Sequence, residues 1–151
     1  MPIIDGREQL AGGEYGCDCF EAGKEGRMVI SFAGAYANPA LKSLIRTLDW
    51  DEADGTLQVE DCYQVTERLQ SIRENLITHW KPEVQGNTVR IRGDESGCTV
   101  AIEGEEVKVD CIRRDFYDHG GQRRDVWLIQ WEVPVAGQAG EVRARFTVRA
   151  V

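Results

Sequence analysis

The sequence lacks the features that would place the chain in or across a membrane. No apolar run approaches the roughly 18 residues that a transmembrane helix requires. Residues 1–5 have neither the basic region nor the apolar stretch of a secretory signal peptide. The residues therefore predict no membrane partner.

Histidine and closely paired cysteine are also scarce, which limits catalysis and metal binding. The only two histidines are His79 and His119, and neither stands in a recognisable nucleophile–base pattern. The five cysteines include one close pair, Cys17 and Cys19, whereas structural zinc normally takes four Cys or His ligands. We therefore predict no metal and no cofactor. The odd cysteine count favours reduced thiols and a cytoplasmic location, unless a signal precedes residue 1.

Excess positive charge is absent. The chain has 18 basic and 26 acidic side chains, a net charge of −8, which disfavours nucleic acid and anionic membranes. Residues 111–151 hold 7 basic and 5 acidic side chains, so residues 1–110 hold the remaining 11 and 21. Any contact with a polyanion is therefore expected in the last third of the chain.

The second half of the chain alternates apolar and polar residues with the period of β-strands. This pattern covers residues 88–92, 100–111 and 142–150, and residues 103–106 are expected to form the turn of a hairpin. Residues 125–135 are apolar on both faces near their middle, which is typical of a central strand covered on two sides. We predict an all-β fold, an antiparallel β-sandwich with at most one or two short helical turns, as a single domain over residues 1–151.

The first half is also rich in expected strands, with one ambiguous stretch. Residues 44–50 and 56–65 flank an Asp-Gly turn and predict a hairpin. Asn38 and Pro39 are suited to the N-cap and first position of a single helical turn. Residues 65–79 show both helical and strand periodicity, and the residues alone lean slightly toward a helix.

Three groups of side chains have both a functional and a structural interpretation. The arginine pairs 113–114 and 123–124 suit a fork for carboxylate or sulfate, or a charged strand edge that prevents pairing. Acidic clusters suit a glycosidase dyad or solvated turns. The four tryptophans suit a sugar-stacking platform, but Trp127 and Trp131 share one face and favour the core.

One part of the sequence resembles a known family. In residues 28–50 an apolar strand runs into Ala35 and Tyr36, a short turn follows, and the next strand leads into a hairpin, as in the family, where that strand is rich in arginine. Residues 57–61 and the opening residues 2–9, followed by Gly12, Gly13 and Tyr15, continue the likeness. Together these blocks resemble the C-terminal β region of heparinase II/III-like polysaccharide lyases.

The resemblance implies an α/α toroid followed by layers of antiparallel sheet, and β-elimination of an acidic polysaccharide. In the family the catalytic groups lie mostly on the toroid, with a histidine near the start of the β region, and none of those motifs is present here. The chain is therefore interpreted as a C-terminal fragment that packs on a missing toroid and is inactive alone, with Met1 replacing upstream sequence. The family pattern also favours strand over helix for residues 70–78.

The resemblance also suggests where substrate is bound. No catalytic residue is predicted, and Arg7, Gln9 and Tyr36 are the candidate substrate-binding residues because they belong to the blocks nearest the missing histidine. The structural alternative is that Tyr36 is a core residue and that Arg7 and Gln9 hold a turn. Two other functions stay open: a stand-alone carbohydrate-binding module, and an interaction domain that forms a homodimer.

Overall fold

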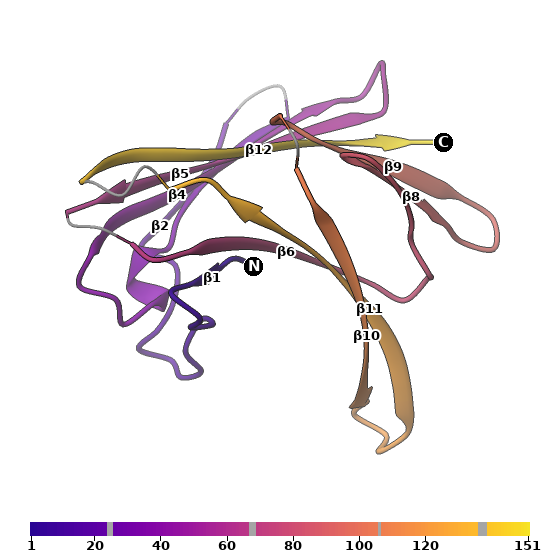
Figure 1. The fold of residues 1–151 in the computed structure, drawn as a ribbon, viewed down its shortest axis with the longest axis horizontal. Coiled ribbons are helices and arrows are strands. Elements are labelled where there is room, and N and C mark those ends of the chain that lie inside the picture. The colour runs from indigo at the N-terminus through magenta and orange to yellow at the C-terminus, as the bar shows by residue number, and fades with distance from the viewer. Residues whose placement is uncertain (24–25, 67–68, 106, 136–138) are drawn as a thin grey trace.

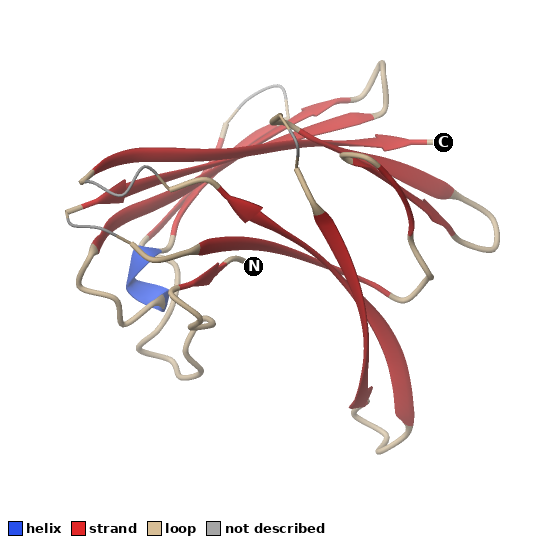
Figure 2. Ribbon diagram, in the orientation of Figure 1, coloured by secondary structure: helices blue, strands red, loops and turns tan. Residues whose placement is uncertain are grey.

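The protein is built from two antiparallel β-sheets that face each other (Figure 1). The computed structural model describes residues 1–23, 26–66, 69–105, 107–135 and 139–151. Apart from one turn of 3-10 helix at Ala33–Ala35, its regular elements are all strands (Figure 2). These are β1 (Ile3–Ile4), β2 (Cys19–Ala22), β3 (Arg27–Ser31), β4 (Leu41–Asp51), β5 (Thr56–Val65), β6 (Ile72–Thr78), β7 (Glu83–Gln85), β8 (Thr88–Arg92), β9 (Gly97–Ile102), β10 (Val109–Tyr117), β11 (Arg123–Val133) and β12 (Gly140–Ala150). The predicted all-β sandwich is confirmed.

The larger sheet has eight strands in the order β2-β3-β4-β5-β12-β9-β8-β7. Its central strand is β12, which pairs with β5 on one side and β9 on the other. The alternation expected for residues 142–150 is present, since Ala144 and Phe146 are buried while Arg143 and Arg145 are exposed. One face of this sheet therefore forms a wall of the core.

The smaller sheet has four strands in the order β1-β6-β11-β10. The strand β11 lies between β6 and β10, as expected for a central strand, but within the described residues the larger sheet covers only its inward face, so the expected cover on both faces is not found. Figure 1 shows the β10–β11 hairpin extending beyond the larger sheet. The chain moves between the two sheets repeatedly, because β1, β6, β10 and β11 alternate along the sequence with strands of the larger sheet.

The core lies between the sheets and is formed by the inward residues of both. Trp131 packs edge-to-face on Phe146, with ring centroids 5.4 Å apart, a geometry that aromatic quadrupoles favour. Tyr63, Ile72 and Ile129 are fully buried beside them. Burial of these side chains is the main stabilising term of the sandwich.

Two local expectations are wrong. Residues 103–106 do not close a hairpin, because β9 pairs with β8 and β12 whereas β10 pairs with β11 in the other sheet. The intervening residues, of which 106 lies outside the described residues, therefore connect the two sheets. The expected helical turn at Asn38 is a non-helical turn in which the Asn38 side chain accepts a hydrogen bond from the Ala40 amide at 3.0 Å.

Two other expectations are confirmed. Residues 72–78 form strand β6, so the strand interpretation of the ambiguous stretch holds there, while residues 67–68 lie outside the described residues. The Asp-Gly turn joins β4 to β5, with Gly55 at φ 61°, a conformation that glycine adopts without strain. In the described part of the chain, no helix is long and apolar enough to cross a membrane.

Candidate functional site

The chemically richest feature is a cluster of ionisable side chains buried between the two sheets. Arg46 of β4 forms a bidentate ion pair with Asp61 of β5, at 2.7 Å from Nε and 2.5 Å from Nη2. Glu74 of β6 faces this pair from the other sheet, 3.7 Å from Arg46 Nη2. The hydroxyl of Tyr63 donates a hydrogen bond to Glu74 Oε1. We call these four residues the interlayer cluster.

Strand parity places the interlayer cluster in the core. Arg46 and Asp61 are direct partners in the β4–β5 ladder and point to the same face. Glu74 follows the buried Ile72 by two residues and therefore also points inward. Within the described residues, no buried side-chain nitrogen or oxygen lacks a hydrogen-bond partner, which is the condition for tolerating such groups in a core.

The interlayer cluster contains two carboxyl groups and one guanidinium, so its charges do not balance if every group is ionised. Burial, reinforced by the nearby Asp61 carboxylate, raises the pKa of the Glu74 carboxyl to about 8. Arg46 keeps its proton, since its hydrogen bonds and attraction to Asp61 raise its pKa against the cost of burial. At neutral pH the cluster is therefore a neutral Glu74 beside an Arg46–Asp61 ion pair.

Tyr36, a predicted substrate-binding residue, is buried next to the interlayer cluster. It is 5% exposed, and its hydroxyl donates a hydrogen bond of 2.8 Å to the Pro2 carbonyl. Burial raises the Tyr36 pKa above its usual value, so the phenol stays protonated. In this structure Tyr36 holds the first residues of the chain against the core.

Removing that hydroxyl tests this role. Tyr36→Phe leaves the buried Pro2 carbonyl without its donor and should lower the free energy of unfolding by about 1–3 kcal/mol. Urea denaturation followed by tryptophan fluorescence measures the change. Tyr117→Phe is the matched control, because Tyr117 is 71% exposed and should change stability little. Equal effects of the two substitutions would contradict the anchoring role.

Arg7 and Gln9, the other two predicted residues, are exposed. Arg7 and Ile4 exchange backbone hydrogen bonds of 2.9 Å, and Arg7 Nη1 donates to the Ala37 carbonyl at 3.2 Å. A further backbone hydrogen bond from Leu10 to the Ala35 carbonyl ties the same two segments together. The structure thus places Arg7 beside the residues that follow Tyr36, while Gln9 lies on the same loop.

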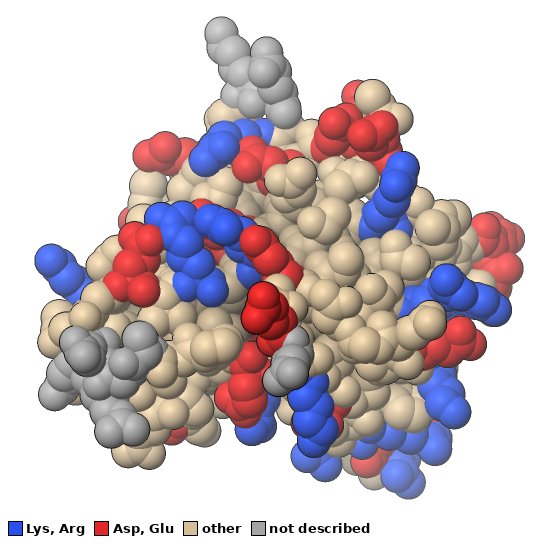
Figure 3. Space-filling view, turned by 45° about the horizontal axis from the view of Figure 1, so that its top comes forward, with Lys and Arg blue, Asp and Glu red and all other residues tan. Residues whose placement is uncertain are grey.

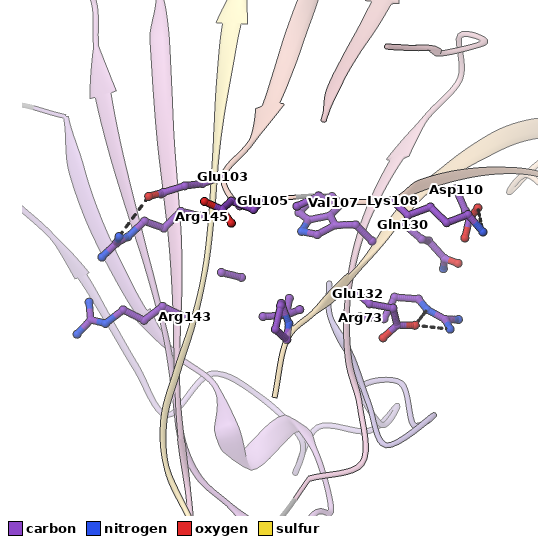
Figure 4. Close-up of a pocket in the computed structure, with 15 residues that line it drawn as sticks. Arg73, Glu103, Glu105, Val107, Lys108, Asp110, Gln130, Glu132, Arg143 and Arg145 are labelled. Atoms are coloured by element: carbon purple, nitrogen blue, oxygen red, sulfur yellow. Dashed lines mark hydrogen bonds and ion pairs between the residues drawn. The ribbon is translucent and has the colours of Figure 1, made fainter. Parts of the chain in front are cut away.

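A cleft of about 440 Å³ opens between β11, β12 and the segment that connects the sheets (Figure 4). The inner lining includes the apolar side chains of Val107, Trp131 and Val133. Figure 4 shows the charged ends of the lining residues directed away from the cavity on both sides. These include Glu103, Arg143 and Arg145 on one side, and Arg73, Lys108, Asp110 and Glu132 on the other; Glu105 also lines the cleft. The cleft is therefore an apolar opening between the sheets and not a cationic groove.

The outward arginines of β12 are neutralised by neighbours. Arg143 pairs with Glu60 at 2.7 Å and with Glu141 at 2.5 Å, and Arg145 pairs with Glu60 and, at 3.6 Å, with Glu103. Figure 3 shows basic and acidic side chains interleaved on the visible face, without one continuous basic field. This row is a charged sheet surface rather than a ready polyanion site.

Most of the arginines near the β10–β11 turn form ion pairs with carboxylates of the same hairpin. Arg113 pairs with Asp125 at 2.5 Å, Arg123 with Asp115 at 3.0 Å and Arg124 with Asp118 at 3.0 Å. These three pairs cross or close the hairpin. Because β10 is an edge strand, the structure agrees with the interpretation of these arginines as a charged sheet edge.

The tryptophans divide between core and surface. Trp131 is buried, with 3% of its surface exposed. Trp127 shares the face of Trp131 by strand parity, and the Lys81 ammonium lies 5.9 Å from the centroid of its ring. Trp50 and Trp80 are 43% and 47% exposed. The core interpretation is correct for Trp131, whereas the two exposed rings remain available for contacts.

Sequence reasoning did not find the interlayer cluster, although a signal was present. In each of the three strands one charged residue occupies an inward position between two apolar ones. Arg46 lies between Leu44 and Leu48, Asp61 between Val59 and Tyr63, and Glu74 between Ile72 and Leu76. A charge at an inward position of a strand indicates a buried pair when a second strand offers the opposite sign.

Comparison with known proteins finds the fold but no sequence family. No protein-family model matches this sequence, and no curated protein matches it. Among solved structures, the fold is similar to a mutant of the heparan sulfate lyase HepC from Pedobacter heparinus, with a TM-score of 0.74 and 11% sequence identity. The similarity covers 99% of this chain and 23% of that lyase chain. At this identity it shows a similar fold.

Proposed function

We propose that this chain is an accessory β-sandwich domain of a heparinase II/III-like polysaccharide lyase. It packs against a catalytic α/α toroid, forms one wall of a cleft for acidic polysaccharide, and does not cleave substrate alone. The observation that carries the proposal is the match of almost the whole chain to about a quarter of a heparan sulfate lyase. The sequence resemblance over residues 2–61 points to the same family.

Burial of the interlayer cluster supports a non-catalytic role. A general acid or base must come within about 3 Å of the proton that it moves. Tyr63 and Glu74 are 0% and 1% exposed, and each is hydrogen-bonded to the other. Their side chains are sealed from a polymer in the solvent, so the proton transfer of β-elimination is assigned to another domain.

The proposed substrate contacts are Arg7 and Gln9. A guanidinium binds a uronate carboxylate or a sulfate through two parallel hydrogen bonds, and an amide side chain adds a neutral donor. Tyr36 supports these contacts by fixing the segment on which they stand. A site with one arginine and an overall acidic chain binds such a sugar weakly, as expected for one wall of a shared cleft.

Nuclear magnetic resonance titration with a heparan sulfate oligosaccharide tests this function. We expect fast-exchange shifts of backbone amides in residues 5–10 and 34–38, and no unsaturated uronate product. Arg7→Ala should reduce the affinity by about tenfold, the loss of one charge-assisted contact. Arg149→Ala is the control, because Arg149 is an exposed arginine on the other sheet.

Two results would count against the proposal. Turnover of the polysaccharide by the purified chain would give it the catalytic groups that we assign elsewhere. Shifts centred on the indoles of Trp50 and Trp80, with neutral and acidic sugars alike, would favour the second candidate, a stand-alone carbohydrate-binding module. The exposure of these two rings is the observation that keeps this alternative open.

A further inference from the structure

The outward face of the smaller sheet carries an apolar row that crosses three strands. Leu128 of β11 is paired in register with Ile77 of β6 on one side and with Ile112 of β10 on the other. These three residues point away from the core, because their neighbours Leu76 and Ile129 point into it. Ile77 is 63% exposed, and the other two are half-buried.

The larger sheet lies against the opposite, inward face, and no further sheet lies against this one in the part of the chain that the structure describes; of the residues that share this face, Gln130 is 6% exposed. The patch extends toward the end of the hairpin through Phe116, which is 39% exposed and packs against His79 with ring centroids 6.2 Å apart. Contiguous apolar surface of this kind is typical of an interaction site.

Two pairs of charged residues stand at equal distances on either side of the apolar row, with opposite sign, and Arg73 and Lys108 lie beside the two carboxylates and form ion pairs with them. On β10, Asp110 and Arg114 lie two residues before and after Ile112. On β11, Arg124 and Glu132 lie four residues before and after Leu128. All four share the outward face by strand parity. Because β10 and β11 are antiparallel, both arginines lie toward the hairpin end and both carboxylates toward the opposite end.

We propose that this face binds a second copy of this chain through a two-fold axis that runs along the apolar row. Such an axis places Ile77, Leu128 and Ile112 against the same residues of the second copy. It also brings Arg114 opposite Asp110 of the second copy and Arg124 opposite Glu132 of the second copy. An isologous interface requires this kind of self-complementarity, and it arises here from the spacing of four charges around one row.

The ion pairs within one copy do not prevent this arrangement. Asp110, Arg124 and Glu132 each have one partner on the same copy, in pairs whose side chains are largely exposed and therefore weak. Arg114 forms no ion pair among the described residues. Asp110, Arg124 and Glu132 can therefore exchange or share their partners when a second copy binds, and Arg114 can form a new ion pair.

The size of the patch sets the expected affinity. It contains far fewer than the 20–30 residues a side that stable interfaces use, so we expect weak association, with a dissociation constant between about 1 µM and about 1 mM. Opposite charges across the interface also make the association sensitive to salt. The prediction is a weak homodimer that dissociates on dilution and at high ionic strength, whatever the result of the sugar titration.

Sedimentation velocity between about 1 µM and about 1 mM tests the dimer, at low and high salt. Asp110→Arg should weaken association by at least about tenfold, because it places an arginine opposite Arg114. The double variant Asp110→Arg/Arg114→Asp restores opposite charges across the axis and should recover the dimer. Arg149→Asp, a charge change of the same size and opposite sign on the other sheet, should leave it unchanged.

The double variant separates this interface from a general effect of charge or folding. Recovery by the double variant supports the two-fold pairing, since only matched positions can compensate each other. A monomer at every concentration at low salt would overturn the proposal, and so would a dimer that Asp110→Arg leaves intact. Far-ultraviolet circular dichroism of each variant confirms that the sheets are retained.

Discussion

Replacing Arg46 with methionine should lower the free energy of unfolding by about 3–5 kcal/mol, the usual cost of removing one partner from a buried ion pair. The substitution keeps a long apolar stem but leaves Asp61, which is 0% exposed, beside Glu74 without its counter-ion. A loss of this size is a large part of the stability of a typical domain. Urea denaturation followed by tryptophan fluorescence measures it.

Two further variants make the Arg46 result interpretable. Arg27→Met removes an exposed ion pair with Asp49 on neighbouring strands of the same sheet, and should cost less than about 1 kcal/mol. The double variant Arg46→Met/Asp61→Leu removes both buried charges and should recover much of the loss, because paired apolar residues fill such sites well. If Arg46→Met and Arg27→Met cost the same, the interlayer cluster is not a stabilising feature of the core.

Stability should fall as the pH rises from about 4.5 to about 8, and Glu74 is the cause. Its carboxyl has a pKa of about 8 in the folded chain, against a reference value of 4.5, because burial and Asp61 disfavour its charge. The folded state therefore holds a proton that the unfolded state loses within this range. The stability linked to Glu74 is fully present below pH 4.5 and is lost progressively up to pH 8, at no more than about 1.4 kcal/mol per pH unit.

Glu74→Gln tests this pH dependence, because the amide keeps the shape and a hydrogen bond with Tyr63 but does not titrate. The variant should remove the downward slope of the unfolding free energy between pH 5 and 8. Glu132→Gln on the neighbouring strand changes an exposed carboxylate and should retain the slope. An unchanged slope in Glu74→Gln would show that Glu74 is already ionised in the folded protein.

The sequence predicted the strands well because alternation is a local property. Residues 72–78 and 142–150 display their apolar face every second residue, and that pattern survives whatever the strand pairs with. The partner with which a strand pairs is not set by its local sequence. The segment around Gly104 was therefore expected to close a hairpin, although the strands on its two sides belong to different sheets. Its composition suits a tight turn equally well when the chain passes from one sheet to the other.

The candidate site was harder to predict for a related reason. Arg7, Gln9 and Tyr36 came from a family resemblance, and the structure places Arg7 and Tyr36 in segments joined by hydrogen bonds. The interlayer cluster depends on strands β4, β5 and β6 meeting across two sheets. A sequence shows that Arg46 and Glu74 point inward once their strands are known, but not that the two sheets bring them within 4 Å of each other.

The position of β12 constrains how this protein can be made in a cell. Residues 140–150 join the β2–β5 half of the larger sheet to the β7–β9 half, so the two halves share no ladder until that last segment arrives. During translation the ribosome must therefore deliver residues 140–150 before the layer can close. Until then the unpaired borders of β5 and β9 are open to wrong partners, and pairings this distant in sequence form slowly. A nascent chain that stalls before residue 140 would therefore be a natural substrate for chaperones.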